Sequence, residues 1–175
     1  MNSRVASVGI SILAALAVLT QPGLGQQAGD KGGVRIGIYD SRAIAVAYAG
    51  STFQTKKLKD LTGQLKKARE AGDTKEVSRL EAEGKAWQAT LHQQGFSTAP
   101  VDDLLAHIAS ELPKIQETAG VTRLISKWNK PELKQHANAE QVDVTLPLID
   151  AFHPTERQRK SAIEIQKHEP QKLKK

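Results

Sequence analysis

The 175-residue sequence contains no cysteine and very few aromatic residues. Without cysteine the chain can form no disulfide, cannot carry a lipid on an N-terminal cysteine, and offers no thiolate ligand to a metal. Phe, Trp and Tyr together make up 4% of the residues, whereas charged residues make up 25%. This balance favours long, solvated helices over a thick globular core. Packing or self-association must therefore provide the stability that disulfides cannot.

Long hydrophobic runs are absent after the first 25 residues. The segment "MNSRVASVGISILAALAVLTQPGLG" has Arg4 as a positive start, an apolar run at 12–19, and a small-x-small site ending at Gly25. We interpret 1–25 as a secretory signal peptide that is cleaved after about Gly25. An uncleaved anchor is disfavoured because the apolar run is shorter than the ~20 residues that span a bilayer. We therefore expect a soluble exported protein.

The formal net charge is +6, and the excess of cations is concentrated in two segments. One is the C-terminal tail, 156–175, which ends in "QKLKK". The other carries six cations against Asp60 alone: Lys56, Lys57, Lys59, Lys66, Lys67 and Arg69. Export argues against nucleic acid as a partner, so acidic unfolded chains and anionic lipid surfaces are the candidate partners of these cations. The alternative is that the lysines only solvate a helix face.

Three short segments have the pattern of β-strands, and they lie near 34–40, 121–128 and 141–145. In "VRIGIYD", alternation places Val34, Ile36 and Ile38 on one face. In "VDVTLPLIDAFHP", we expect Thr145 to cap a short helix that turns its apolar residues inward. A flexible leader, 26–33, precedes the first strand.

Helical patterns fill most of the chain between the first and second strands. Apolar residues recur every three or four positions from Leu58 to Ala68 and again from Val77 to Leu91, with a break at "AGD" (71–73). This spacing predicts an antiparallel helical hairpin over about 42–94. A third helix is expected over about 101–119, kinked at Pro113. The predicted fold class is α+β, mainly helical, with a long hairpin projecting from a small β-sheet body.

The order of these elements resembles the Skp/OmpH-like periplasmic chaperone family. The resemblance covers 34–155, and the stretches that carry it are the opening "VRIGIYD", the Lys- and Glu-rich hairpin, "GVTRLISKW" and the closing "VDVTLPLIDAF". It implies a periplasmic homotrimer whose coiled-coil arms hold unfolded outer-membrane proteins without ATP, in outer membrane protein biogenesis. The arms of this sequence are shorter than those of the family and are interrupted by "QGFSTAP".

No residue pattern in the sequence indicates an enzyme, a metal site or a cofactor. The five histidines stand far apart, and none forms a ligand pair with another. The predicted function is therefore unfolded-protein binding, with the six cations at 56–69 as client- or anion-binding residues. A non-enzymatic envelope structural or adaptor protein, binding a folded partner through the hairpin, is the alternative. The residues predicted to build and assemble the body are Val34, Ile36, Ile38, Val142, Val144 and Phe152.

Overall fold

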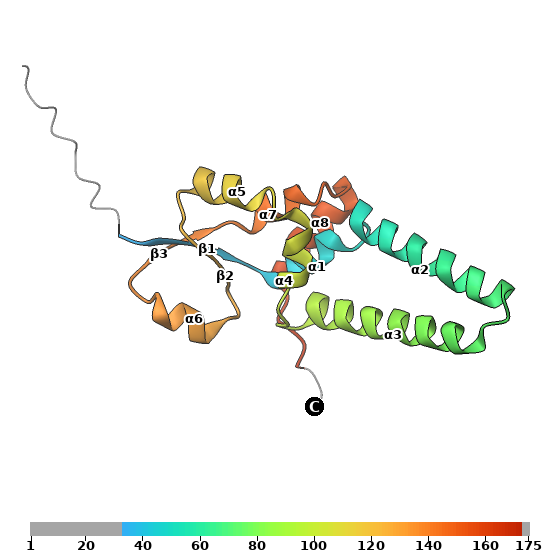
Figure 1. Ribbon diagram of the computed structural model, residues 1–175. Helices are drawn as coiled ribbons and strands as arrows, with labels where there is room; N and C mark the ends of the chain where they lie inside the picture. Colours follow the sequence, from blue (N-terminus) through green and yellow to red (C-terminus); the bar gives the residue numbers. More distant parts are fainter. Residues whose placement is uncertain (1–32, 173–175) are drawn as a thin grey trace, which may run out of the picture. The chain divides into compact units, whose positions relative to one another are not determined.

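Residues 33–172 of the computed structural model are mainly helical and contain one small sheet (Figure 1). The predicted signal peptide, all of the leader except Gly33, and the last three residues of the tail lie outside the described residues. The strands are β1 (Arg35–Tyr39), β2 (Leu124–Ser126) and β3 (Glu140–Asp143). The α-helices are α1 (Ser41–Tyr48), α2 (Thr52–Glu70), α3 (Thr74–Phe96), α4 (Asp102–Leu105), α5 (Leu112–Ala119), α6 (Lys130–Gln135), α7 (Thr145–Ala151) and α8 (Glu156–Glu164). Two short 3-10 turns are η1 (Ala106–Ile108) and η2 (Ile165–Lys167).

The three strands form a parallel sheet in the order β2-β1-β3. All three lie within the segments predicted from the sequence, whereas their parallel orientation was not predicted. Gly37, in the middle of β1, pairs with Leu124 of β2 and Val142 of β3. A Cβ atom at position 37 would lie 2.9 Å from Cγ2 of Val144, so this close approach requires glycine. The central strand therefore packs tightly against the start of α7.

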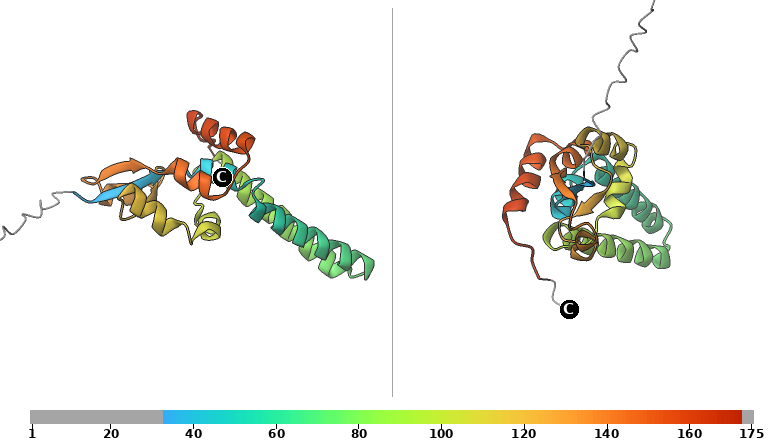
Figure 2. Two further views of the ribbon diagram at one scale, coloured as in Figure 1. Left: turned by 90° about the horizontal axis from the view of Figure 1, so that it is seen from above. Right: turned by 90° about the vertical axis from the view of Figure 1, so that its left-hand side faces the viewer.

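The core lies where α1 follows β1 and is surrounded by α3, α7 and α8. Ala43, Ala45 and Ala47 are small enough to let three helices approach α1 closely, and they are all buried. Tyr48 packs edge-on against Phe152, with ring centroids 6.1 Å apart. Figures 1 and 2 show the strands at one end of this core and the α2–α3 hairpin leaving from the other.

The hairpin begins later than predicted, at Thr52 instead of about 42. Residues near 42 belong to the separate helix α1, which ends before Gly50, a residue with a φ of 85°. The side chain of Ser51 then caps α2 by accepting a hydrogen bond from the Gln54 N–H. The tip was predicted correctly: Gly72 has a left-handed φ of 69°, and Asp73 caps α3.

The segment predicted as a third helix, 101–119, is broken into α4, η1 and α5. Pro113 does not kink a continuous helix, because the break precedes it and the proline lies in the first turn of α5. This position tolerates proline because its missing N–H would have no helical acceptor. The prediction of a bend was therefore right, but its position and its cause were wrong.

The basic tail, predicted only as 156–175, contains the helix α8, which packs against α1. A capping box formed by Thr155 and Gln158 starts this helix. Arg159 of α8 binds Asp150 of α7, with Nε lying 2.6 Å from Oδ1. The Gln158 side chain also donates a hydrogen bond of 3.3 Å to the carbonyl of Ala49. The tail therefore contacts the connection between α1 and the hairpin, residues 49–51, which we call the hinge.

Candidate functional site

The α2–α3 hairpin is the largest part of the described chain that lies outside the core (Figure 2). Its two helices, of 19 and 23 residues, pack against each other, and the hairpin meets the core through Phe53 at the start of α2 and through the last turns of α3. At a rise of 1.5 Å per residue, α2 is about 28 Å long. Because Leu61 lies beside Gly84 and Arg69 binds Glu81, the two helices run antiparallel.

The apolar stripe predicted for α2 faces two directions. Ala68 is buried against α3 and Leu61 is partly buried, whereas Leu58 is 53% exposed. Trp87 of α3 is partly buried against the core and lies beneath Lys57, whose Nζ is 5.2 Å from the ring centroid. Trp87 continues the apolar spacing from Val77 to Leu91, and the structure shows that it packs against the core. The hairpin thus buries a narrow strip of apolar side chains between its helices and leaves part of its apolar surface exposed to solvent.

The six predicted binding cations all lie on α2, but the structure does not bring them together. Lys56 and Lys57 line a cavity of about 240 Å³ that faces α3 and His107. Lys59, Lys66 and Arg69 line a separate open groove around Leu65, and Lys67 lines neither. The sequence correctly placed these cations on one helix, but it did not show that they lie on different faces of that helix.

Several of these cations pair with carboxylates of the hairpin itself. The pairs and their N–O distances are Lys56–Asp60 at 2.8 Å, Lys66–Glu70 at 3.8 Å and Arg69–Glu81 at 2.9 Å. These exposed pairs contribute little to stability, and an incoming anion can compete for the cations. Within residues 33–172, Lys59 and Lys67 have no ion-pair partner.

The residues predicted to build the body are largely placed as expected. Ile36, Val144 and Phe152 are buried, and Ile38 and Val142 are half-buried. Val34 is the exception, because β1 begins at Arg35 and Val34 is exposed. The prediction that one face of β1 is inward was too narrow. Gly37 and Tyr39 on the opposite face are buried as well, as is usual for a central parallel strand.

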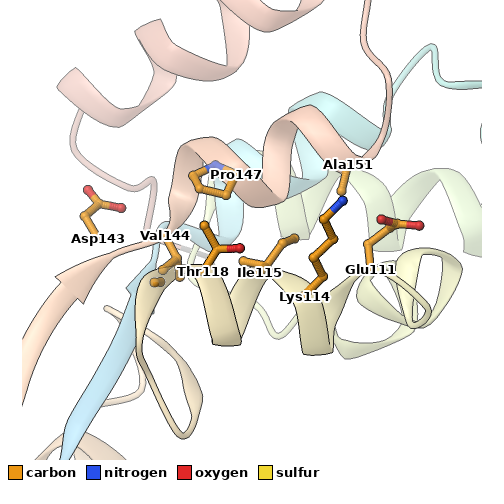
Figure 3. A pocket seen from close by; sticks show the side chains of 9 residues that line it. Glu111, Lys114, Ile115, Thr118, Asp143, Val144, Pro147 and Ala151 are labelled. Carbon is orange, nitrogen blue, oxygen red and sulfur yellow. The ribbon is translucent and has the colours of Figure 1, made fainter.

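Both outer edges of the sheet are open within residues 33–172, since β2 and β3 each pair only with β1. Beside the end of β3, a groove of about 350 Å³ separates α5 from α7. Figure 3 shows Ile115 and Thr118 of α5 facing Val144 and Pro147 across it. Leu146, the residue before Pro147, is one of the exposed large hydrophobic residues. An open edge next to an apolar groove is a surface suited to protein association.

A buried ion cluster lies at the carboxyl end of β1. The carboxylate of Asp40 accepts hydrogen bonds from both Nε and Nη2 of Arg42, at 3.2 and 2.9 Å, and from the Trp128 indole at 3.1 Å. Lys127 Nζ lies 2.8 Å from the same carboxylate. Arg42 in turn donates a hydrogen bond of 2.7 Å to the carbonyl of His168 in the tail.

This cluster joins the sheet to the C-terminal segment. It lies at the edge where parallel sheets commonly bind ligands. Here, however, the N-terminus of α1 is capped by a carboxylate of the protein itself, that of Asp40. Thr145, predicted to cap α7, has a different role: its Oγ1 accepts a hydrogen bond of 3.0 Å from the Asp40 N–H. Val144 holds the N-cap position of α7 without a side-chain hydrogen bond.

The histidines that the sequence left without a role are dispersed. His107 stacks on Tyr48, with ring centroids 5.2 Å apart, and His92 packs against Phe96. Between residues 33 and 172, no group of three or more His, Cys, Asp or Glu side chains could hold a metal ion. None of the helices in that range is long and apolar enough to cross a membrane.

Comparison with known proteins adds no further assignment. No protein-family model, no curated protein and no solved structure matches the chain. The resemblance to Skp/OmpH-like chaperones therefore remains a prediction that rests on the sequence. The candidate functional surfaces are the exposed hairpin and the open edges of the sheet.

Proposed function

We propose that the protein is an ATP-independent holdase of the periplasm that captures unfolded polypeptides, outer-membrane proteins among them. The observation that carries the proposal is the hairpin, whose α2 combines an exposed Leu58 with a groove lined by cations. A structural hairpin that served only the core would bury its apolar stripe instead. The resemblance to Skp/OmpH-like chaperones supports the same function.

The proposed capture mechanism uses many weak contacts. Cations on α2 attract extended, acidic segments at long range, and leucine side chains such as Leu58 and Leu65 contact their apolar residues. Each contact is weak because the groove is shallow and open to water. Several hairpins in one assembly supply the affinity by raising the effective concentration of binding surface around a client.

Self-association is part of the proposal. Within residues 33–172 the sheet of three short strands leaves two open edges, and strands with open edges tend to pair with strands of another chain. The apolar groove beside β3 and the exposed Leu146 extend the same surface. The number of subunits, three, comes from the family resemblance. The sheet is thus proposed as the assembly interface, and the hairpins as the client-binding arms.

The adaptor function is the second candidate, and two features favour it. The arms are short, with 19 and 23 residues, and three of the six cations already pair with hairpin carboxylates. Such a surface could bind one folded partner instead of many unfolded chains.

An aggregation assay separates the two candidates. Residues 26–175 are added without ATP to three unrelated proteins diluted from denaturant, one of them an outer-membrane β-barrel protein. A holdase suppresses the light scattering of all three at stoichiometric ratios. Protection of none of them contradicts the proposal and leaves the adaptor function. Static light scattering of the same sample gives the native mass, and a monomer at all concentrations contradicts the assembly.

A further inference from the structure

A second cavity, of about 340 Å³, opens at the carboxyl ends of β1 and β2. Tyr39 and Ser126, which are register partners on the two strands, form its floor. Asp102 of α4 and Glu132 of α6 contribute carboxylates from two other segments, and Trp128 and Asn129 complete the polar lining. Ligands of parallel sheets bind at this edge, outside the carboxyl ends of the strands.

The charge of this cavity is negative. Asp102 and Glu132 line it, and no Lys or Arg among the described residues does. Arg42 and Lys127 approach the Trp128 ring from nearby, at 4.9 and 4.8 Å from the centroid. Both of these cations are bound by Asp40, so that trio adds one net positive charge against the two carboxylates of the cavity. The field in the cavity therefore favours a cation over an anion.

Tyr39 is the residue that points to a ligand. Its side chain lines the cavity and is only 5% exposed, and its hydroxyl, which is open to the cavity, forms no hydrogen bond within residues 33–172. A hydroxyl that faces a cavity and has no partner in the protein is free to form a hydrogen bond with a polar group placed there. A bound polar group in the cavity would provide that partner.

The ionisation of Tyr39 agrees with a negative cavity. Burial, and then the charges of Asp102 and Glu132, raise its pKa to about 12. The phenol therefore stays protonated at neutral pH. It can donate its proton to a carboxylate while its oxygen accepts a hydrogen bond from a cationic N–H donor.

From this arrangement we infer that the cavity formed by Tyr39, Asp102 and Glu132 binds the side-chain cation of a lysine or arginine in a polypeptide. The two carboxylates neutralise the cation and accept its hydrogen bonds, and the phenol oxygen accepts another. A bare metal ion is disfavoured, because the described residues gather only two carboxylates here and no third ligand of the His, Cys, Asp or Glu class. The site lies in the body and is independent of the hairpin function proposed above.

The test is a titration of residues 26–175 with N-acetyl-lysine methylamide, N-acetyl-arginine methylamide and the neutral N-acetyl-norleucine methylamide. Two-dimensional NMR follows the indole N–H of Trp128 and the side-chain amide of Asn129. We expect at least one of the two cationic probes to shift both signals with a millimolar dissociation constant, and the neutral probe to shift neither.

Three variants distinguish the site from a diffuse surface effect. Asp102→Asn and Glu132→Gln should each weaken binding about tenfold, as the loss of a hydrogen bond to a charged group implies. Tyr39→Phe should weaken it less and should leave the melting temperature unchanged, since the hydroxyl makes no bond to the described chain. Glu111→Gln, which removes a carboxylate from the groove between α5 and α7, is the matched control and should bind normally.

Three results would overturn the inference. The first is that neither cationic probe shifts the two NMR signals, even at a concentration about 50-fold above the expected dissociation constant. The second is an equal shift from the norleucine probe, and the third is unchanged affinity in the Asp102→Asn/Glu132→Gln double variant.

Discussion

Replacing Asp40 with asparagine tests the buried ion cluster that joins the sheet to the tail. The change keeps the size of the side chain but removes its charge, and Arg42, which is 1% exposed, keeps its own. Removing one partner of a buried ion pair costs about 3–5 kcal/mol. With about 2–4 °C per kcal/mol for a chain of this size, the melting temperature should fall by about 6–20 °C.

Two further variants show whether the loss comes from the pair itself. Lys127→Met removes a partner whose side chain is 33% exposed, so its effect should be much smaller. The double variant Asp40→Asn/Arg42→Met also removes the charge that Asp40→Asn leaves unpaired. It should lose less stability than the sum of the losses in the single variants Asp40→Asn and Arg42→Met. Melting is followed by circular dichroism at one protein concentration. An Asp40→Asn variant that melts like the wild type, or strictly additive losses, would refute this account of the cluster.

The same cluster predicts the response to acid. Burial alone would raise the pKa of Asp40, but hydrogen bonds from Arg42, Lys127 and Trp128 outweigh burial and hold it below the ordinary value of 3.8. A carboxylate whose folded pKa is lower than its unfolded pKa stabilises the fold above about pH 3.8, and this contribution is lost as the pH falls further. The wild type should therefore lose stability relative to Asp40→Asn below about pH 4.

Three other predictions concern the hinge, the interface and the hairpin. Gly50→Ala should lower the free energy of unfolding by about 1–3 kcal/mol, because φ is 85° there and the new Cβ would meet the Gln158 side chain. In thermal melts, adding Gln158→Ala to this variant should recover only part of the loss. Leu146→Asp should reduce the native mass in light scattering without lowering the helical content, and an unchanged mass would remove Leu146 from the interface. Replacing the three groove cations with glutamine should weaken client capture most at low ionic strength, whereas the same charge change in the body should not. The groove variant is Lys59→Gln/Lys66→Gln/Arg69→Gln, and its control is Lys130→Gln/Lys134→Gln/Lys160→Gln.

Local patterns predicted the elements that depend on local chemistry. The hairpin tip was correct because Gly72 and Asp73 have backbone and capping preferences that act within one turn. The strand positions were correct because alternation marks each strand by itself.

Features that depend on residues far apart in the sequence could not be predicted. Thr145 resembles an N-cap, but its hydroxyl bonds the Asp40 N–H, 105 positions earlier. The tail was seen only as basic, because α8 is held by Ala162 packing against α1 and by a bond from Gln158 to Ala49. The cavity at Tyr39 was missed for the same reason, since its carboxylates come from α4 and α6. One signal was available in the sequence, because Asp102 is an acidic residue at the start of the helix expected over about 101–119.

Deleting the outer hairpin tests the central claim most directly. Removing residues 59–85 and joining the ends with a short Gly-rich turn leaves Trp87 and Leu91, which pack against the core, in place. The measurement is the light scattering of an unfolded outer-membrane protein diluted into the shortened chain. Protection should be lost, whereas the melting transition and the number of subunits in the assembly should be kept. Protection equal to that of the full hairpin would contradict the account, because the client-binding surface would then lie elsewhere.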